Sequence, residues 1–429
     1  MQQLSPRRVA VSLLVRILDH RQTLDEALAQ DAGFSALEGS DRGFARAMVS
    51  AVLRWLGQLD KILARHVTGR DFYDLDPEVR HLLRVGAAQV CILRTPMHAA
   101  VSETVETARS VDGARKAGGL INAVMRKLAP EDLETLNAPA VLVWPDNFRK
   151  LMTDTLGGPG ATALAESTLE PPPLDLTVPK DAKLWAEKLG GEQIGPASVR
   201  LEEGVVDTLT GYDTGNWWVQ DVAATLPVQV LAPKKGEHVL DVCAAPGGKT
   251  LQIAASGAKV TALDRSAKRL RLVRENLKRT RLEAECIAAD ATKWTPETLV
   301  DAVLLDAPCS ALGTLRRHPE SPWIKLAEDL ERFPSIQARL LDAAAQMVKP
   351  GGRLVYCVCT PLPREGVDVV NAFLEANPEW KRAPLVAEAL APFAQAVTSD
   401  GDILTLPGAA DLARGHDAFF IASLIREEH

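Results

Sequence analysis

The stretch from Leu240 to Thr250 reads Leu-Asp-Val-Cys-Ala-Ala-Pro-Gly-Gly-Lys-Thr and constrains the fold more than any other part of the chain. The residues that lead into it, 238–242, are apolar and β-branched, as in a buried parallel strand. The residues that follow, 250–255, can begin a helix. Because Gly247 and Gly248 permit a sharp bend, we predict a strand, a glycine turn and a helix, the arrangement that places a nucleotide-like ligand at a helix N-terminus.

Three interpretations compete for this loop. Gly-Lys-Thr suggests a phosphate-binding P-loop, but that motif needs glycine where Cys243 stands, and the dinucleotide fingerprint Gly-x-Gly-x-x-Gly is absent. A methyltransferase-type loop for S-adenosylmethionine (SAM) remains, with an ordinary tight turn as the alternative. The SAM interpretation requires a carboxylate about 20 residues on, at the end of the next strand, to bind ribose hydroxyls. The segment Lys259-Val-Thr-Ala-Leu-Asp264 supplies it.

Length and composition limit the other classes of function. With 429 residues we expect two or three domains, and no run reaches the roughly 18 to 20 apolar residues that span a membrane. The N-terminus does not resemble a signal peptide. Six cysteines without a Cys-x-x-Cys pair predict free thiols in the reducing cytoplasm and no metal. The net charge of −7 means that any RNA binding must use locally concentrated positive charge.

Residues 1–135 predict a helical bundle. Ser5-Pro6 is a helix start, and Thr23-Leu-Asp-Glu26 fits a capping box. The bundle contains no catalytic constellation, so we interpret it as a binding or docking module. Five arginines are candidates for phosphate contacts, although solvated helix faces explain them equally well: Arg7, Arg8, Arg16, Arg42 and Arg46.

The proline-rich region 136–214 predicts a linker and a small α/β subdomain, and residues 215–429 predict the catalytic domain. In that domain strands alternate with helices, which indicates a parallel sheet covered on both faces, as in Rossmann-like α/β domains. The expected strands are 237–243, 258–264, 284–289, 301–306 and 353–358, with a late pair near 394–405 and 418–424. The helix near 266–281 carries seven basic residues. Either it faces RNA or it is a solvated outer helix.

Ligands of open parallel sheets bind at the carboxyl ends of the strands, so three further loops should line the site. Asp290, in the first loop, is placed to accept the adenine amino group. The second loop, Leu305-Asp306-Ala-Pro-Cys309-Ser310, and the third, Tyr356 to Pro361 with Cys359, each bring a cysteine to the site. A cysteine just past a strand end is a better nucleophile candidate than a buried one.

The glycine loop and the two cysteine loops occur in an order that resembles the RNA 5-methylcytosine methyltransferase family of the NOL1/NOP2/Sun type. The resemblance rests on Asp-Val-Cys-Ala-Ala-Pro-Gly-Gly-Lys-Thr, then Asp-Ala-Pro-Cys-Ser with Arg316-Arg-His-Pro, then Tyr-x-x-Cys-Thr. The helical N-terminal region resembles a NusB-like RNA-binding domain. This pairing is similar to bacterial methyltransferases of 16S ribosomal RNA. It implies a multidomain chain with a class I SAM-dependent methyltransferase domain, acting as a monomer on RNA.

The resemblance also implies roles for individual residues. Cys359 would be the nucleophile that adds to cytosine C6, Cys309 would help to release the product, and Asp306 would bind the base near N3. Asp264 would hold the ribose of the cofactor. The loop that wraps SAM would consist of Cys243, Ala244, Ala245, Pro246, Gly247, Gly248 and Lys249, with Asp290 and Asp306 beside it. Arg316, Arg317 and His318 would contact the RNA backbone, and the target cytosine would be flipped or single-stranded.

The sequence departs from the family pattern at Val358-Cys359-Thr360, where Thr-Cys-Ser is usual. We expect Cys357 to point to the opposite face of the strand from Cys359, and we do not take it as the nucleophile. Two other functions stay open. One is 5-methylcytosine formation in transfer RNA, and the other is a non-catalytic RNA-binding protein of assembly or antitermination type.

Overall fold

The computed structural model describes residues 5–385 and 390–428 and divides the chain into two compact units. We call Met1–Glu170 with Leu315–Leu326 the helical unit, and Pro171–Thr314 with Ala327–His429 the sheet unit. The expected subdomain 136–214 is therefore divided, because its first part belongs with the helices and its second with the sheets. Residues 1–4, which open the stretch tested for a signal peptide, lie outside the described residues. In the part that the structure describes, no helix has the length and apolarity that crossing a membrane requires.

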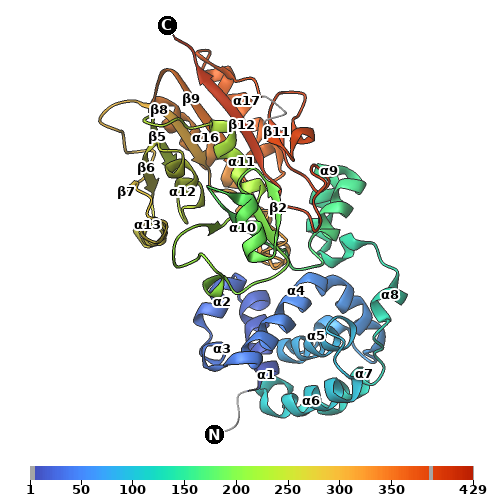
Figure 1. Cartoon of the computed structure of the whole chain (residues 1–429). Coiled ribbons are helices and arrows are strands. Elements are labelled where there is room, and N and C mark those ends of the chain that lie inside the picture. Colours follow the sequence, from blue (N-terminus) through green and yellow to red (C-terminus); the bar gives the residue numbers. More distant parts are fainter. Residues whose placement is uncertain (1–4, 386–389, 429) are drawn as a thin grey trace. The chain divides into compact units, whose positions relative to one another are not determined.

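The helical unit is built around α4, which packs against α1 and α5 (Figure 1). Helix α1 begins at Pro6 as predicted, although the Ser5 side chain makes no capping hydrogen bond. The predicted capping box is confirmed, because the Thr23 side chain accepts from Glu26 N and Glu26 accepts from Thr23 N. The helices are α1 (Pro6–Leu14), α2 (Leu24–Gln30), α3 (Ala32–Ala36), α4 (Gly39–His66), α5 (Pro77–Cys91), α6 (Met97–Ser110), α7 (Gly118–Met125), α8 (Asp132–Leu136), α9 (Asp146–Glu166) and α14 (Ser321–Ile324).

Segment 315–326 is distant from residues 1–170 in the sequence but is part of the helical unit. Ile324 lies in the core of that unit and Trp323 packs against it. The Arg54 guanidinium of α4 donates to the carbonyl oxygen of Arg316 at 2.7 Å, and Leu24 N donates to Glu320 Oε1 at 3.2 Å. The chain therefore passes directly from the Cys309 loop into the helical unit.

The sheet unit contains two sheets. A small antiparallel sheet has the order β2-β3-β1-β4, and the large one has the order β10-β12-β9-β8-β5-β6-β7, with β11 beside β12. Strands β5 to β9 are mutually parallel, whereas β12 is antiparallel to β9. The strands are β1 (Leu174–Thr177), β2 (Glu192–Gly195), β3 (Ser198–Leu201), β4 (Trp218–Val219), β5 (His238–Val242), β6 (Lys259–Asp264), β7 (Glu285–Ala288), β8 (Val300–Asp306), β9 (Val348–Val358), β10 (Trp380–Arg382), β11 (Ile403–Leu404) and β12 (Phe420–Arg426).

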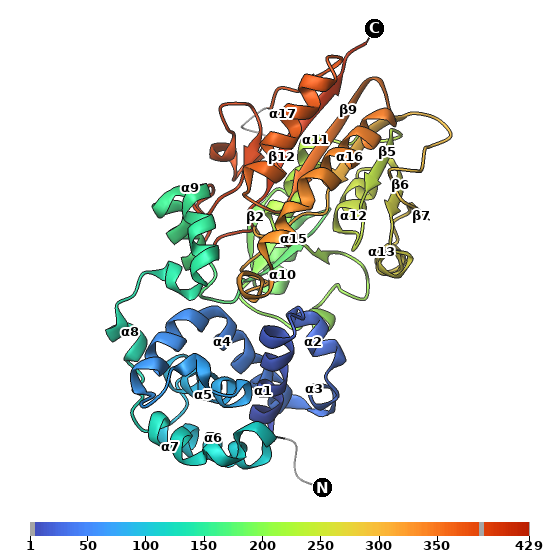
Figure 2. The same ribbon diagram turned by 180° about the vertical axis from the view of Figure 1, so that it is seen from behind.

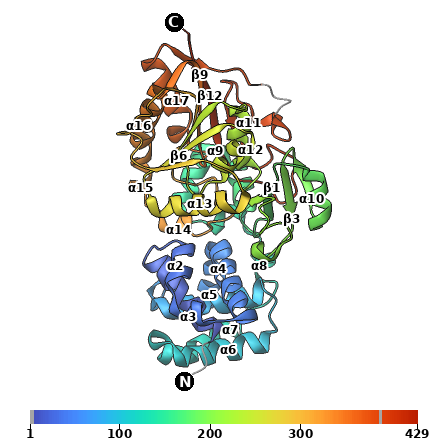
Figure 3. The ribbon, with the colours of Figure 1, turned by 60° about the vertical axis from the view of Figure 1, so that its left-hand side comes forward.

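The predicted α/β fold is confirmed, with helices on both faces of the large sheet (Figures 2 and 3). Alternation along each strand divides the core: Leu240 and Val242 face α16 and α17, whereas Val239 faces α11 and α12. Segment 394–405, expected as a strand, is a short 3-10 helix followed by the two-residue β11. The helices are α10 (Ala182–Leu189), α11 (Leu226–Leu231), α12 (Gly248–Ala255), α13 (Ala267–Thr280), α15 (Ala327–Glu331), α16 (Phe333–Gln346) and α17 (Val367–Ala376).

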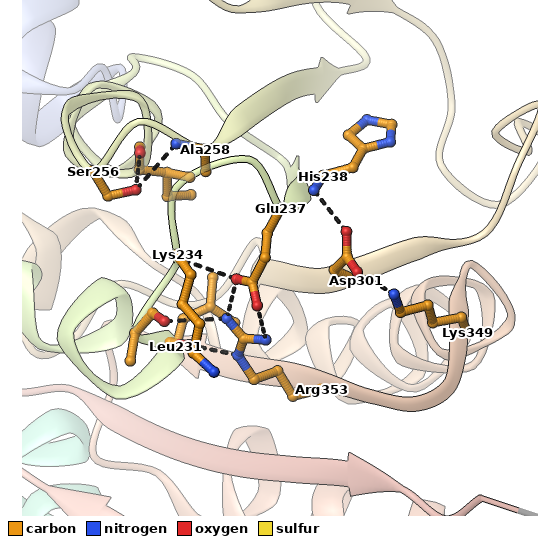
Figure 4. Close-up of polar contacts among 11 residues, drawn as sticks. Leu231, Lys234, Glu237, His238, Ser256, Ala258, Asp301, Lys349 and Arg353 are labelled. Carbon is orange, nitrogen blue, oxygen red and sulfur yellow. Dashed lines mark hydrogen bonds and ion pairs between the residues drawn. The ribbon is translucent and has the colours of Figure 1, made fainter.

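The amino edge of the large sheet is held by a polar network (Figure 4). Arg353 of β9 pairs with Glu237 at 2.6 Å and donates to the carbonyl oxygen of Leu231, at the end of α11. Asp301 of β8 accepts from His238 N at 2.7 Å and pairs with Lys349. These contacts join β5, β8 and β9 at the edge opposite their carboxyl ends, which leaves the carboxyl edge for ligands.

Candidate active site

The order of the large sheet reverses between β5 and β8, and the loop after β5 lies at this switch point. Cys243 has a φ of 63° and Gly247 a φ of 110°, both in the left-handed region. A Cβ atom on Gly247 would lie 3.2 Å from Val273 of α13, so the turn accommodates no larger residue without displacement. The loop then enters α12 at Gly248, with the amides of the first helical turn unpaired within the helix.

Two buried carboxylates hold this loop. Asp264, at the end of β6 and 4% exposed, accepts from Ala245 N at 3.1 Å and from Ser266 N at 2.8 Å. Asp241 of β5 accepts from the Thr250 hydroxyl, and burial raises the pKa of Asp241 to about 7. The backbone path of the glycine loop is therefore determined by side chains from two adjacent strands.

The carboxylates expected from sequence follow at the ends of the next two strands. Asp290, after β7, accepts from the hydroxyl and the amide of Thr292, which lowers its pKa and keeps it ionised. Asp306 ends β8 and pairs with Lys249 Nζ at 2.8 Å. Burial is the largest single influence and lowers the pKa of Lys249, but the charge and hydrogen bond of Asp306, together with Cys357 and Cys359, leave that pKa raised, so the ammonium stays protonated.

The two candidate nucleophiles meet at the same edge. Cys309 follows β8 and Cys359 follows β9, and their Sγ atoms lie 3.3 Å apart. Contact with Cys359 and burial both raise the pKa of Cys309 well above its ordinary value. At rest Cys309 is therefore a thiol that faces a second sulfur atom.

A buried network ties the two cysteine loops together. The hydroxyls of Ser310 and Thr360 are 2.9 Å apart, each directly after its cysteine. Glu365, 0% exposed, accepts from Ser310 N at 2.8 Å and from Gln337 Nε2 of α16 at 3.0 Å. The Tyr356 hydroxyl donates to the Glu365 carbonyl oxygen at 2.6 Å. Glu365 thus connects β9, α16 and the Cys309 loop.

Two expectations from the sequence need correction. Cys357 does not face away from Cys359. Both cysteines pack on the α11 and α12 side of the sheet, because residues two apart along a strand point to the same face. Cys357 Sγ lies 3.4 Å from Asp306 Oδ1, and burial raises its pKa well above the ordinary value. Arg316 is only 2% exposed, so its guanidinium is not presented to an RNA backbone. Arg317 is exposed and His318 half-buried, and RNA contacts by these two stay predictions.

Sequence reasoning did not find Glu365 or Gln337. Both are polar residues whose roles depend on long-range packing, and the only local signal is that Glu365 lies six residues after Cys359. In the described ranges no group of three His, Cys, Asp or Glu side chains could hold a metal ion.

Comparison with known proteins matches both parts of the chain. The family model "16S rRNA methyltransferase RsmB/F" matches residues 228–425, and the NusB family model matches residues 4–130. Ribosomal RNA small subunit methyltransferase B of Vibrio vulnificus is 33% identical over 98% of this chain and 99% of its own length. The protein of that name from Pseudomonas putida is 34% identical over 99% of both chains.

Solved structures share the fold. The crystal structure of PH0851 superposes with a TM-score of 0.74 at 23% identity and covers 99% of both chains. NSun6 from Pyrococcus horikoshii, solved with SFG, has a TM-score of 0.57 at 19% identity and covers 66% of this chain and 99% of its own.

Proposed function

Because the chain belongs to the RsmB/F family of 16S rRNA methyltransferases, we propose that it transfers a methyl group from SAM to C5 of a cytosine in 16S ribosomal RNA. The observation that carries this proposal is the pair of thiols, Cys309 and Cys359, 3.3 Å apart at the carboxyl edge of the sheet. Methylation at a ring nitrogen or a hydroxyl requires no thiol, whereas methylation at C5 requires a nucleophile at C6 and a route for the C5 proton to leave. An rRNA substrate places the reaction in the cytoplasm.

The chain has residues that fit SAM. The glycine turn and the first turn of α12 would take the methionine part, and Asp264 and Asp290 would take the ribose and the adenine amino group. Gly247 keeps this cradle open at the backbone, because it adopts a left-handed φ and lacks the Cβ atom that would lie 3.2 Å from Val273. When bound, SAM would supply an electrophilic methyl group.

Cys359 begins the reaction as a thiolate. Its sulfur bonds to C6 of the cytosine, and the electron pair of the C5–C6 double bond moves so that C5 becomes nucleophilic. Asp306 binds the base near N3 and favours protonation of N3 as negative charge develops there, and the Lys249 ammonium orients Asp306 at 2.8 Å. SAM held by the glycine loop would supply the methyl group that the nucleophilic C5 accepts, and S-adenosylhomocysteine would be the leaving group.

Cys309 completes the reaction. After Cys359 has become a thioether, Cys309 no longer faces a second ionisable thiol, so one cause of its raised pKa is removed. Cys309 then loses its thiol proton to solvent, and as a thiolate it takes the proton from C5. The electrons of the C5–H bond restore the double bond, and the S–C6 bond breaks and releases Cys359 as a thiolate.

The test uses purified protein, tritiated-methyl SAM and 16S rRNA that lacks the modification, with the label mapped by bisulfite sequencing. We expect label at one cytosine for the wild type, none for Cys359→Ala, and a trapped protein–RNA adduct for Cys309→Ala. Cys286→Ala, which changes a thiol of β7, serves as the matched control and should behave as wild type. If Cys309→Ala abolishes the adduct while Cys359→Ala keeps it, the nucleophile has been assigned wrongly.

Labelling of transfer RNA and isothermal titration of SAM separate the alternatives. Label on transfer RNA and none on 16S rRNA would identify transfer RNA as the substrate. If isothermal titration shows no SAM binding, the chain is a non-catalytic RNA-binding protein.

A further inference from the structure

Positive charge is concentrated in one short segment of this acidic chain. Residues 265–281 contain eight of the 49 Lys and Arg residues and only one of the 56 Asp and Glu residues. The segment has a net charge of +7 in a chain whose net charge is −7, so the remainder carries −14. An even distribution of charge does not produce this contrast. The positive charge of the segment creates a local field that attracts phosphate.

Helix α13 presents this charge to solvent. Its N-terminus is capped by Ser266, and its buried stripe consists of Leu270, Val273 and Leu277. The side chains opposite that stripe are exposed, including the basic residues Lys268, Arg271 and Lys278. From 268 to 278 the helix rises about 15 Å, so these cations form a row along one face.

Some of the basic residues are structural. Arg269 donates to the carbonyl oxygen of Ala245 in the glycine loop, and Arg274 donates to that of Cys286. Arg279 donates to the carbonyl oxygens of Tyr212 and Trp217. These three fasten α13 to its own unit and are not available as a group for a partner.

Others have no protein partner in the structure. Within segment 265–281, all of which the structure describes, four basic side chains form no hydrogen bond or ion pair: Arg265, Lys268, Lys278 and Arg281. Arg271 pairs only with the exposed Glu275, at 3.6 Å, and an exposed pair of this kind contributes little to stability. Repulsion between the positive charges of the row therefore destabilises the fold, and only the weak Arg271–Glu275 pair offsets it.

We propose that the row Lys268, Arg271 and Lys278 on α13 binds the phosphate backbone of the RNA substrate. Helix α13 starts just after β6, whose carboxyl end carries Asp264, so its first turn lies beside the loop assigned to the cofactor. The row holds flanking RNA while the target cytosine lies against Cys309 and Cys359. This inference rests on the proposed function for the identity of the RNA.

The size of the effect follows from counterion release. Each phosphate contact on single-stranded nucleic acid contributes about −0.7 to the slope of log affinity against log salt, so three contacts contribute about −2. Between 50 and 200 mM salt a slope of that size alters affinity by about 16-fold. A salt titration therefore reports the row directly, whatever the rate of methyl transfer.

The experiment compares binding of unmodified 16S rRNA and steady-state methylation for the wild type and the triple variant Lys268→Ala/Arg271→Ala/Lys278→Ala. We expect Kd and KM for RNA to rise about tenfold at 50 mM salt, with the salt slope less steep by about 2 and kcat unchanged at saturating RNA. SAM affinity should stay the same. The control Lys183→Ala/Lys188→Ala/Lys381→Ala removes equal charge from exposed positions elsewhere in the sheet unit and should leave the salt slope unchanged.

A variant that should bind RNA more tightly excludes damage to the fold as the explanation for the triple variant. Glu275→Gln removes the one acid from the row and releases Arg271, so RNA binding should tighten about two- to threefold with a steeper salt slope. Unchanged slopes in both the triple and the Glu275→Gln variants would overturn the proposal. Absence of methyl label with the wild type would instead contradict the proposed function, while RNA binding would still test the row.

Discussion

The Sγ atoms of Cys309 and Cys359 lie 3.3 Å apart although the two residues are separated by 50 positions in the chain. Strands β8 and β9 are parallel neighbours in which Asp306 pairs with Cys357, so the residues just beyond both strand ends meet at one edge of the sheet. This relationship supports the proposed division of work between the two thiols, and it also makes them reactive toward each other.

Oxidation of the pair should inactivate the enzyme reversibly. A disulfide requires a sulfur separation of about 2.05 Å, which a small movement of either loop provides. Two thiols would lose two protons and two electrons, which reduce one hydrogen peroxide to two waters. We expect peroxide to abolish methyl transfer, dithiothreitol to restore it, and mass spectrometry of the blocked, digested protein to show a Cys309–Cys359 link. Cys91→Ala should remain equally sensitive, and oxidation confined to other cysteines would contradict the prediction.

Glu365→Gln should slow catalysis without weakening substrate binding. Glutamine still accepts from Ser310 N, but the negative charge, which together with contact to Cys359 and burial raises the pKa of Cys309, is gone. The pKa of Cys309 should fall, so the pH dependence of kcat should move to lower pH; because a thiolate of lower pKa is a weaker base toward the C5 proton, kcat should fall roughly tenfold with KM little changed. The exposed Glu331→Gln is the control. A loss of activity with an unmoved pH profile would mean that Glu365 has only a structural role.

Gly313→Ala should disrupt the Cys359 loop. A Cβ atom at Gly313 would lie 1.9 Å from the carbonyl oxygen of Ala418 and 3.0 Å from that of Cys359, both backbone atoms. The amide of Gly313 also donates to the Cys359 carbonyl oxygen at 2.9 Å. We expect loss of RNA adduct formation and a lower thermal midpoint. Gly43→Ala, whose Cβ would meet nothing within 4 Å, should leave both unchanged or slightly raise the midpoint.

Arg353→Met should destabilise the sheet unit more at neutral pH than in acid. Arg353 is the largest cause of the lowered pKa of Glu237. A lowered folded-state pKa gives stability that is present above the unfolded value, near 4.5, and is lost as the pH falls through the folded value. Urea unfolding at pH 7 should show a loss of about 1–3 kcal/mol, and the difference from wild type should shrink below about pH 4. A loss that is equal at both pH values would show that packing, and not the ion pair, is responsible.

Part of the site could be predicted from the sequence because its determinants are local. Apolar β-branched runs ending in Asp264 or Asp306 specify parallel strands, and the glycines at 247 and 248 specify the turn between β5 and α12. The capping box at Thr23 is local in the same way. Each pattern depends on residues within a few positions, so it can be recognised in the sequence without knowledge of any long-range contact.

One local pattern was predicted wrongly, and other features were decided by the tertiary structure. The direction of Cys357 follows from the two-residue period of β9, and our expectation for it was wrong because that period was misapplied. The burial of Arg316 has no local cause: segment 315–326 packs into a core built from the first 128 residues, which only long-range contacts could show.

The sequence by itself therefore determined which residues end each strand and which chemistry they can carry. Only the tertiary structure decided that Cys309 meets Cys359, that Glu365 holds both loops, and that Asp306 pairs with Lys249. The physical reason is that strand order and register bring distant strand ends together, and these depend on burial of both faces of the sheet rather than on any neighbour in the chain.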